Sequence, residues 1–374
     1  MNLVNVTKMA AGYAPGRLKD GTACLVLVAK GTFTIPTEPK ASPKLVPEQP
    51  KPYNSDGYAG DPASSYALFE NDYPPFKPFC DVLLHGSAYT KNGEPTECVR
   101  VGLVVGTSLR KQFNVIGDRT WSYYIFGCKP SQPSRFTQLP INWERAYGGT
   151  DNFDPERMKM YQANPIGTGY WPKTPDAKIE DLPVPNTEEI GNPIQKTTGK
   201  YAPQGFGPIG RHWSPRVKYA GTYDQQWQEQ RAPYLPDDFD ERFYQCAPAD
   251  QQIPYLQGGE TVQLVNLSPH GILQFSLPKV EVPMTVIRLD GYRESLSPVI
   301  DTLILEPDKG IFSFVWRTHL PIPFGPKEIK MLLIGKPTPG RERAYMMNKP
   351  YVPLSELTRF AKQYQAIMKE NEDR

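Results

Sequence analysis

The sequence predicts a mainly β protein: antiparallel sheets in a sandwich or barrel-like arrangement, with long proline- and glycine-rich loops and one C-terminal helix. Three observations lead to this prediction. Apolar and β-branched runs of strand length recur in the first and last parts of the chain. The 41 prolines among 374 residues are roughly twice the share expected from an average of about 5%, and proline interrupts helices and central strands alike. A helical spacing of apolar residues is convincing in the last segment alone.

The first strands are expected between residues 22 and 127. Residues 22–35, "TACLVLVAKGTFTI", are rich in β-branched and apolar side chains, and similar runs follow at 80–89, 98–106 and 112–127. The run at 112–127 has a polar break in its middle. We therefore expect the first part of the chain to form antiparallel β structure.

Residues 36–65 separate the first strand from the next one. This stretch contains almost no apolar residues and has a proline every few positions. Such a composition offers little burial to offset the entropy that ordering the backbone would cost. We expect an exposed and mobile excursion here.

The middle of the chain, residues 151–254, has little periodicity but is rich in aromatic side chains. Disordered chains are poor in aromatics, so we expect ordered irregular structure. The chain would then form one β-rich domain over residues 1–335, or two β subdomains at about 1–150 and 255–335 joined by this segment, with a C-terminal extension over 336–374. The aromatic residues are Phe153, Tyr161, Tyr170, Trp171, Tyr201, Phe206, Trp213, Tyr219, Tyr223, Trp227, Tyr234, Phe239, Phe243 and Tyr244.

Turn signals divide the C-terminal third into hairpins. Residues 261–278 predict a hairpin about Ser268-Pro269-His270-Gly271, and the Asp290-Gly291 pair predicts a further turn. Residues 299–319 predict another hairpin, about Pro307-Asp308-Lys309-Gly310. Alternation assigns the faces of its second strand: Phe312, Phe314 and Trp316 are expected in the core, and Ile311, Ser313, Val315 and Arg317 on the opposite face.

The last segment, residues 354–374, predicts an amphipathic helix. Ser355 can cap its start, and the apolar stripe needs a partner, which we expect to be the protein's own sheet. The stripe consists of Leu354, Leu357, Phe360, Ala361, Tyr364, Ile367 and Met368.

Charge and hydropathy argue against nucleic-acid and membrane partners. Lys and Arg total 42 against 40 for Asp and Glu, a formal net charge of +2, which gives no strong field toward nucleic acid or anionic lipid. No apolar run approaches the roughly 20 residues that span a bilayer, and the N-terminus lacks the pattern of a secretory signal. One basic and aromatic stretch, 211–227, lacks a basic domain around it. We expect a cytoplasmic protein.

Metal and cofactor motifs are not found. The four histidines and five cysteines are widely spaced, without a CxxC pair, so we expect neither a zinc site nor a disulfide framework. The stretch "GFGPIG" at 205–210 matches GxGxxG in letters, but Pro208 and the lack of a βαβ setting argue against a dinucleotide site. We expect no cofactor.

The stretch "INWERAYGGTD", residues 141–151, can be interpreted in two ways. Glu144 with Asp151, or with Asp154, could act as general acid and base of a carbohydrate-active hydrolase. Alternatively, Arg145 pairs with an acid, the two glycines allow a tight turn and the aromatic residues pack. The structural interpretation is favoured, because sequence spacing says nothing about the distance between the two carboxylates.

Several blocks together resemble the domain of unknown function 2169 family. They are "PPFKPFCDVLLHGSAY" (74–89), "IGDRTW" (116–121), "LPINWERAYGGTD" (139–151), "NPIGTGY" (164–170), the run 203–252 and "VIDTLILEPDKGIFSFVWR" (299–317). The resemblance runs from near residue 1 to about 335. The chain has "LPVPNTEE" at 182–189 where the family often has LPNxE.

The resemblance implies a binding protein of bacterial type VI secretion and not an enzyme. Such proteins act as adaptors or chaperones that load a toxic effector onto the spike tip, so the implied partners are an effector and a spike-tip protein. Aromatic loops on a β scaffold suit such contacts, and Trp171, Phe206 and Trp227 are the candidate contact residues. A structural component of the secretion apparatus is an alternative.

Overall fold

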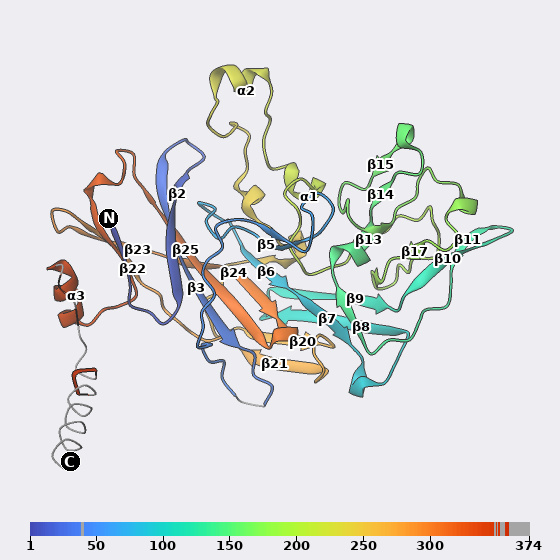
Figure 1. Cartoon of the computed structure of the whole chain (residues 1–374), viewed down its shortest axis with the longest axis horizontal. Coiled ribbons are helices and arrows are strands. Elements are labelled where there is room, and N and C mark those ends of the chain that lie inside the picture. Colours follow the sequence, from blue (N-terminus) through green and yellow to red (C-terminus); the bar gives the residue numbers. More distant parts are fainter. Residues whose placement is uncertain (39–40, 348, 350, 352–355, 359–374) are drawn as a thin grey trace, which may run out of the picture.

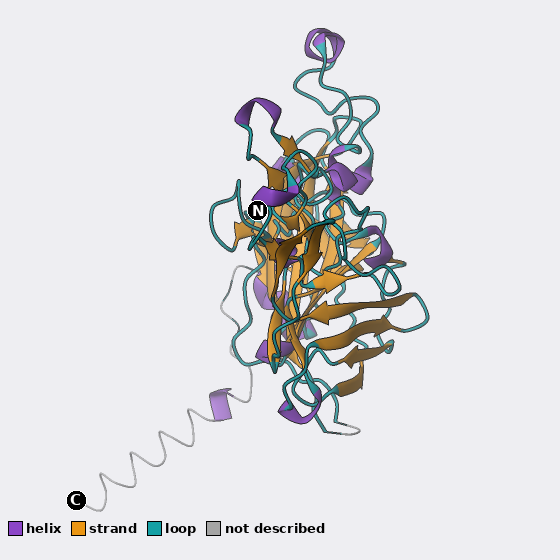
Figure 2. Ribbon diagram, turned by 90° about the vertical axis from the view of Figure 1, so that its right-hand side faces the viewer, coloured by secondary structure: helices purple, strands orange, loops and turns teal. Residues whose placement is uncertain are grey.

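The computed structural model of the chain describes residues 1–38, 41–347, 349, 351 and 356–358 (Figure 1). Most of its elements are strands and most strand pairs are antiparallel, which confirms the predicted mainly β class. Seen from the side, the strands lie together in the centre, and loops and short helices surround them (Figure 2). Two larger sheets provide the framework for the other elements.

The largest sheet contains six strands among the described residues, in the order β19–β6–β24–β25–β3–β2. β6 and β24 are parallel, and the other neighbours are antiparallel. The predicted turn at 307–310 joins β24 to β25, and Gly310 has a φ of 66°, which glycine adopts without strain. The strands are Gln252–Ile253 (β19), Cys80–Leu84 (β6), Val299–Glu306 (β24), Ile311–Pro321 (β25), Ala23–Thr34 (β3) and Ala10–Arg17 (β2).

The second sheet has five strands in the part of the chain that is described, in the order β18–β9–β8–β20–β21. The predicted hairpin about 268–271 joins β20 to β21. Strands from before residue 150 and after residue 255 share both large sheets, so the two β-rich segments form one sheet system. The strands are Thr187–Glu188 (β18), Leu109–Ile116 (β9), Cys98–Val105 (β8), Thr261–Val265 (β20) and Ile272–Ser276 (β21).

Smaller sheets flank these two. The order β1–β26–β22–β23 joins Asn2–Asn5, Ile329–Ile334, Met284–Arg288 and Arg293–Leu296, with the predicted Asp290-Gly291 turn between the last two. A second group, β11–β10–β17, joins Gly127–Pro130, Arg119–Tyr124 and Pro183–Val184. Two-stranded pairs are β12 (Gln138–Ile141) with β7 (Gly86–Tyr89), β13 (Tyr147–Gly148) with β16 (Thr168–Gly169), β14 (Thr150–Asp151) with β15 (Lys159–Met160), and β4 (Gly57–Tyr58) with β5 (Ala67–Phe69).

The helices within the described residues are short. The α-helices are Ser214–Val217 (α1), Gln225–Gln230 (α2) and Pro339–Met346 (α3), and α3 lies in the predicted C-terminal extension. The helix predicted over 354–374 lies outside the described residues except for 356–358, which are helical. The 3-10 turns are Lys91–Gly93, Trp143–Arg145, Pro155–Arg157, Asp176–Lys178, Glu241–Tyr244, Ala249–Gln251, Pro307–Lys309 and Pro326–Glu328.

One buried cluster joins the two large sheets face to face, as in a sandwich. Leu27 and Phe314 of the six-stranded sheet belong to the same cluster as Leu103 and Leu264 of the five-stranded sheet. The rings of Phe312 on β25 and Phe275 on β21 stack with centroids 5.4 Å apart. Aromatic stacking of this kind adds to the stabilisation that comes from burial alone. Both sheets are therefore needed to exclude water from this core.

The predicted core face of β25 is confirmed, since Phe312, Phe314 and Trp316 are buried. The opposite face of β25 is covered too, because Ser313, Val315 and Arg317 are also buried. The Ser313 hydroxyl lies 2.8 Å from the Thr32 hydroxyl, and the Arg317 guanidinium lies 3.3 Å from Asp301. Val315 packs with Cys24, Val26 and Val28 in a separate apolar cluster. Period-two alternation separates the two faces but cannot say that both are covered.

The excursion after β3 is exposed but not free, which corrects the expected mobile segment. The Thr34 N–H donates to Lys44 O at 2.8 Å and the Val46 N–H donates to Thr32 O at 3.0 Å. The Gln49 side chain also binds both main-chain groups of Thr32. β2 pairs with β3 as far as Lys30, and residues 44–46 then pair with the next residues of β3 along the same edge. Main-chain pairing can order a segment that has little apolar surface.

The middle segment is ordered and irregular, as expected, and it forms an arm carrying α2 and a lobe around β10, β11 and β13–β17 (Figure 1).

A buried carboxylate on β6 anchors the end of this segment. Asp81 accepts hydrogen bonds from the Cys246 N–H at 2.9 Å, the Ala247 N–H at 3.1 Å and the Gln245 side-chain amide at 2.7 Å. The Lys77 ammonium lies 2.7 Å from the same carboxylate.

Candidate partner-binding site

The stretch 141–151 contains β13 and β14 of the lobe and the 3-10 turn that precedes them. The Asn142 side chain caps the 3-10 turn that follows it, accepting from the Arg145 N–H at 3.1 Å. The buried Trp143 ring packs edge-on against Trp213 at 5.8 Å. Gly148 has a φ of 151°, and a Cβ there would lie 2.2 Å from the main-chain oxygen of Asn164. Only glycine fits this close approach of two backbones.

Asp151 is a structural carboxylate in this loop. It is 2% exposed and accepts hydrogen bonds from the Lys173 N–H at 2.7 Å, the Thr174 N–H at 3.0 Å and the Thr174 hydroxyl at 2.7 Å. Burial alone would raise the pKa of Asp151, but these hydrogen bonds outweigh it and lower the pKa below the ordinary value. A carboxylate engaged in this way braces the loop. No hydrogen bond or ion pair joins its side chain to that of Glu144, both of which are described.

Tyrosine rings fill the interior of the lobe. Tyr147 lies at the centre, with ring centroids 5.2 Å from Tyr161, 6.4 Å from Tyr170 and 5.2 Å from Tyr201. Burial in this cluster raises the pKa of Tyr147 well above its usual value, so the phenol stays protonated and apolar in character. Trp121 from β10 is fully buried in the same cluster. The recurring aromatics of this segment are therefore mainly its core.

The β10–β11 hairpin projects from this core (Figure 1), and apolar side chains lie at its tip. Ile125 is 91% exposed and Phe126 is 87% exposed, and both adjoining tyrosines are exposed too. Tyr124 is paired with Gly127, so Ile125 and Phe126 form the two-residue turn. Short hairpin turns usually carry Asn, Asp or Gly. Neither turn chemistry nor burial within the described part of the chain explains two large apolar residues here.

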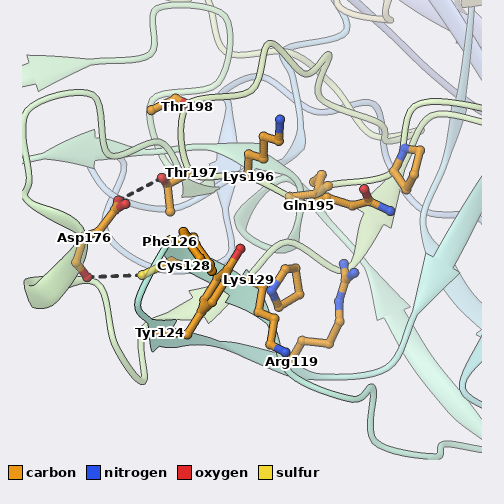
Figure 3. Close-up of a pocket in the computed structure, with 14 residues that line it drawn as sticks. Arg119, Tyr124, Phe126, Cys128, Lys129, Asp176, Gln195, Lys196, Thr197 and Thr198 are labelled. Atoms are coloured by element: carbon orange, nitrogen blue, oxygen red, sulfur yellow. Dashed lines mark hydrogen bonds between the residues drawn. The ribbon is translucent and has the colours of Figure 1, made fainter.

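A groove of about 660 Å³ lies beside this tip (Figure 3). One wall is the hairpin with Tyr124, Phe126 and Lys129, and the other is the segment 193–198. Asp176 fastens the walls together, since its carboxylate accepts from the Thr197 hydroxyl at 3.1 Å and its main-chain oxygen accepts from the Cys128 thiol at 3.2 Å. We call the tip residues 123–126 and this groove the tip site.

The charged groups of the tip site are mostly cationic. The Arg119 guanidinium is buried and lies 2.6 Å from Glu188, so its charge is compensated within the protein. The Lys129 ammonium lies 5.4 Å from the centre of the Tyr124 ring, within the range of cation–π attraction. Lys196 is exposed on the opposite wall. Burial raises the pKa of the Cys128 thiol, which keeps it protonated and a poor nucleophile.

The tip site combines exposed apolar side chains with a concave surface. Within the described residues, no group of three or more His, Cys, Asp or Glu side chains could hold a metal ion. Exposed aromatic and aliphatic side chains beside a concave surface are typical of protein recognition sites. The tip site can hold an apolar side chain of a partner against Phe126 while cations border it.

A family model covers residues 20–317, which is most of the chain. Its description is "Uncharacterized protein conserved in bacteria (DUF2169)". The chain belongs to this family. No curated protein and no solved structure matches the chain. The matched range lies within the span of the sequence resemblance and contains all of the lobe, the arm and the tip site.

The three contact residues predicted from the sequence lie apart in this DUF2169 protein. Phe206 is 1% exposed and packs on Phe113 at 4.7 Å, so it is a core residue and has no exposed face to offer a partner. Trp171 is half-buried against the tyrosine cluster. Trp227 lies on α2 of the arm, half-buried, with its indole N–H donating to Tyr234 O at 2.8 Å. A contact role for Trp171 and Trp227 stays a prediction.

Sequence reasoning missed the tip. Residues 123–126, "YYIF", were assigned to the end of a long strand, because an exposed turn and a buried strand of that composition look alike. The glycine that follows, with a φ of 116°, was the available turn signal. None of the described helices is long and apolar enough to cross a bilayer.

Proposed function

We propose that this DUF2169 protein is an adaptor, or chaperone, that binds a type VI secretion effector in the cytoplasm and helps to load it onto the spike complex. The secretion role comes from the family resemblance, and the binding role is supported by the tip site. The observation that carries the proposal is the pair Ile125 and Phe126, exposed at the end of the β10–β11 hairpin beside a groove. The effector and a spike-tip protein are the proposed partners.

The energetics favour a partner at this tip. Fully burying one large apolar side chain is worth about 1.5 to 3 kcal/mol. A partner that covered both Ile125 and Phe126 would therefore gain this free energy of burial twice. The hairpin is held by four residue pairs between β10 and β11, and Trp121 anchors its base in the lobe. A tip on such a support is presented to a partner at a low entropic cost.

The hydrolase alternative has less support. Its acid–base pair would need Asp151 free to exchange a proton with a substrate, yet three hydrogen bonds occupy the Asp151 carboxylate. Turnover of a glycan panel by the protein, abolished by Glu144→Gln in a folded variant, would restore that alternative. The adaptor proposal expects no turnover.

Co-purification with a candidate effector tests the proposal. The protein is expressed together with a toxin encoded beside it, and the complex is measured by gel filtration and calorimetry. The double variant Ile125→Ser with Phe126→Ser should weaken binding by about 30-fold to 1,000-fold, equivalent to about 2 to 4 kcal/mol from lost burial. The melting temperature of the free protein should not fall, because both side chains are exposed.

Phe324→Ser is the matched control. Phe324 is 90% exposed, like the tip residues, but lies in the loop between β25 and β26. This variant should bind the effector as the parent does. Equal weakening by both variants would mean that general surface hydrophobicity, and not the tip, carries the contact. If no neighbouring toxin binds the parent, or if gene deletion stops all secretion, the adaptor proposal is wrong.

A further inference from the structure

The outer edges of the two large sheets differ in how well they are protected. Exposed edge strands invite pairing with other chains, and proteins blunt them with short length, charge, proline or bulges. β18 and β19 each have only two residues, and β2 carries Pro15 and Arg17. β21, "ILQFS", has five residues with no charge, no proline and no bulge in its register with β20. It is the unprotected edge of this pair of sheets in the described structure.

Alternate residues of β21 turn their main-chain groups away from the sheet. On the side of β20, the Leu277 N–H donates to Glu260 O at 2.9 Å and the Asn266 N–H donates to Gly271 O at 2.8 Å. In an antiparallel ladder this pattern continues at every second residue. The odd-numbered residues therefore pair with β20, and the N–H and C=O groups of Ile272, Gln274 and Ser276 point outward. No hydrogen bond in the described structure uses these six groups.

The side chains beside this edge are arranged for continuing the sheet. Leu273 and Phe275 are buried in the main core, whereas Ile272, Gln274 and Ser276 are exposed. A strand added to the edge would place alternate side chains next to Leu273 and Phe275, where apolar groups would extend the core. Its other side chains would lie beside Ile272, which is 62% exposed, and Gln274.

We propose that the free edge of β21 binds an extended, uncharged segment of the client protein by strand addition, with apolar residues at alternate positions. The ligand chemistry follows from the edge: outward main-chain donors and acceptors select an extended backbone, and the absence of charge in β21 offers no partner to a charged segment. This contact goes beyond the tip site, and it rests on the proposed function only for the statement that the segment belongs to the client.

A client segment fits this edge better than a second copy of the chain. A five-residue strand spans about 17 Å at about 3.4 Å per residue. A standard stable interface uses about 20 to 30 residues on each side, far more than one short strand supplies. A short linear segment that is also tethered through another contact needs no such area, because tethering raises its effective concentration.

The test uses the full-length protein and a synthetic peptide of about seven residues that alternates valine with threonine. Hydrogen exchange measured by mass spectrometry should show slower exchange of the β21 amides when the peptide is present at up to millimolar concentration. A peptide with N-methylated alternate residues cannot form the ladder and should have no effect. Because no effector is used, failure here overturns the edge proposal and leaves the adaptor proposal standing.

Gln274→Pro is the decisive variant. It removes an N–H that points away from β20, so it should leave the fold intact, as proline is tolerated where the N–H faces solvent. Peptide binding should fall at least tenfold, while the control Gln274→Thr should bind like the parent. Leu273→Pro, which removes a ladder bond, should lower the melting temperature and serves as a check on the register.

Three outcomes would overturn the proposal. The peptide could leave the exchange of β21 unchanged in the parent, or it could slow exchange equally in Gln274→Pro. The third is a parent protein that is dimeric by light scattering, with β21 already protected and released by Gln274→Pro. That result would assign the edge to a second copy of the chain and not to a client.

Discussion

Replacing Asp81 by asparagine should destabilise this protein more than replacing its ion-pair partner Lys77 by methionine. Asp81 is fully buried, and its carboxylate receives Lys77 together with three N–H donors from residues 245–247. Lys77 in turn has the Thr302 hydroxyl at 3.2 Å besides the carboxylate. The Asp81 carboxylate therefore links β6 of the six-stranded sheet to residues 245–247, at the end of the aromatic middle segment.

The magnitudes follow from what each variant leaves behind. Asp81→Asn leaves a buried ammonium without its anion and turns an amide NH₂ toward other donors, which should cost about 3 to 5 kcal/mol. Lys77→Met leaves a carboxylate that still accepts from three N–H groups, so the cost should lie at or below about 3 kcal/mol. Asp81→Ala would also orphan the Cys246 and Ala247 N–H groups, at about 1 to 3 kcal/mol each, and should fail to fold.

Urea denaturation at pH 7, followed by tryptophan fluorescence, measures the difference as the change in midpoint multiplied by the m-value. Coincidence with a circular dichroism transition checks that unfolding is two-state. The reasoning is refuted if Asp81→Asn costs less than about 1 kcal/mol, below the range for breaking a buried pair, or if Lys77→Met is the more costly change. Either result would mean that the pair is not buried with the partners described above.

The pH dependence provides a second check on Asp81. Burial would raise the pKa of this carboxyl, but Lys77 and the amide donors lower it below its ordinary value. A lowered folded pKa stabilises the protein above the unfolded value, about 3.9, and this contribution is lost as the pH falls through the folded pKa. The parent should therefore lose this stability below about pH 4, and Asp81→Asn should reduce that acid sensitivity.

Two further substitutions test the core and the lobe. Trp316→Ala should cost about 3 to 5 kcal/mol, because the ring is buried and packs edge-on against Phe314 at 5.3 Å; an unchanged urea midpoint would contradict its burial. Gly148→Ala should destabilise the lobe by more than about 3 kcal/mol, since strain in φ adds to a clash with Asn164 O. Gly191→Ala is its control, with a φ of 86° but no atom within 4 Å of the added Cβ. Equal melting temperatures for the two alanine variants would rule out the clash.

The strands and turns of the C-terminal third were predictable because their signals are local. The turns at 268–271, 290–291 and 307–310 lie where glycine and its neighbours indicated them. Alternation likewise found the core face of β25. The same local signals failed for residues 36–65, because the pairing of Lys44 and Val46 with β3 depends on an edge that β2 leaves open.

The sequence by itself determined the β class, the turns and the aromatic, irregular character of the middle segment, since composition and spacing act within a few residues. Only the tertiary structure decided which apolar groups remain outside. Phe206 and Phe126 are both phenylalanines followed directly by glycine, yet Phe206 is 1% exposed and Phe126 is 87% exposed. The hydrogen bonds of Asp151 and the position of β21 at the edge of its sheet likewise depend on the tertiary structure. The burial of a side chain and the pairing of a strand depend on segments that are distant in the chain, so a local sequence pattern cannot predict them.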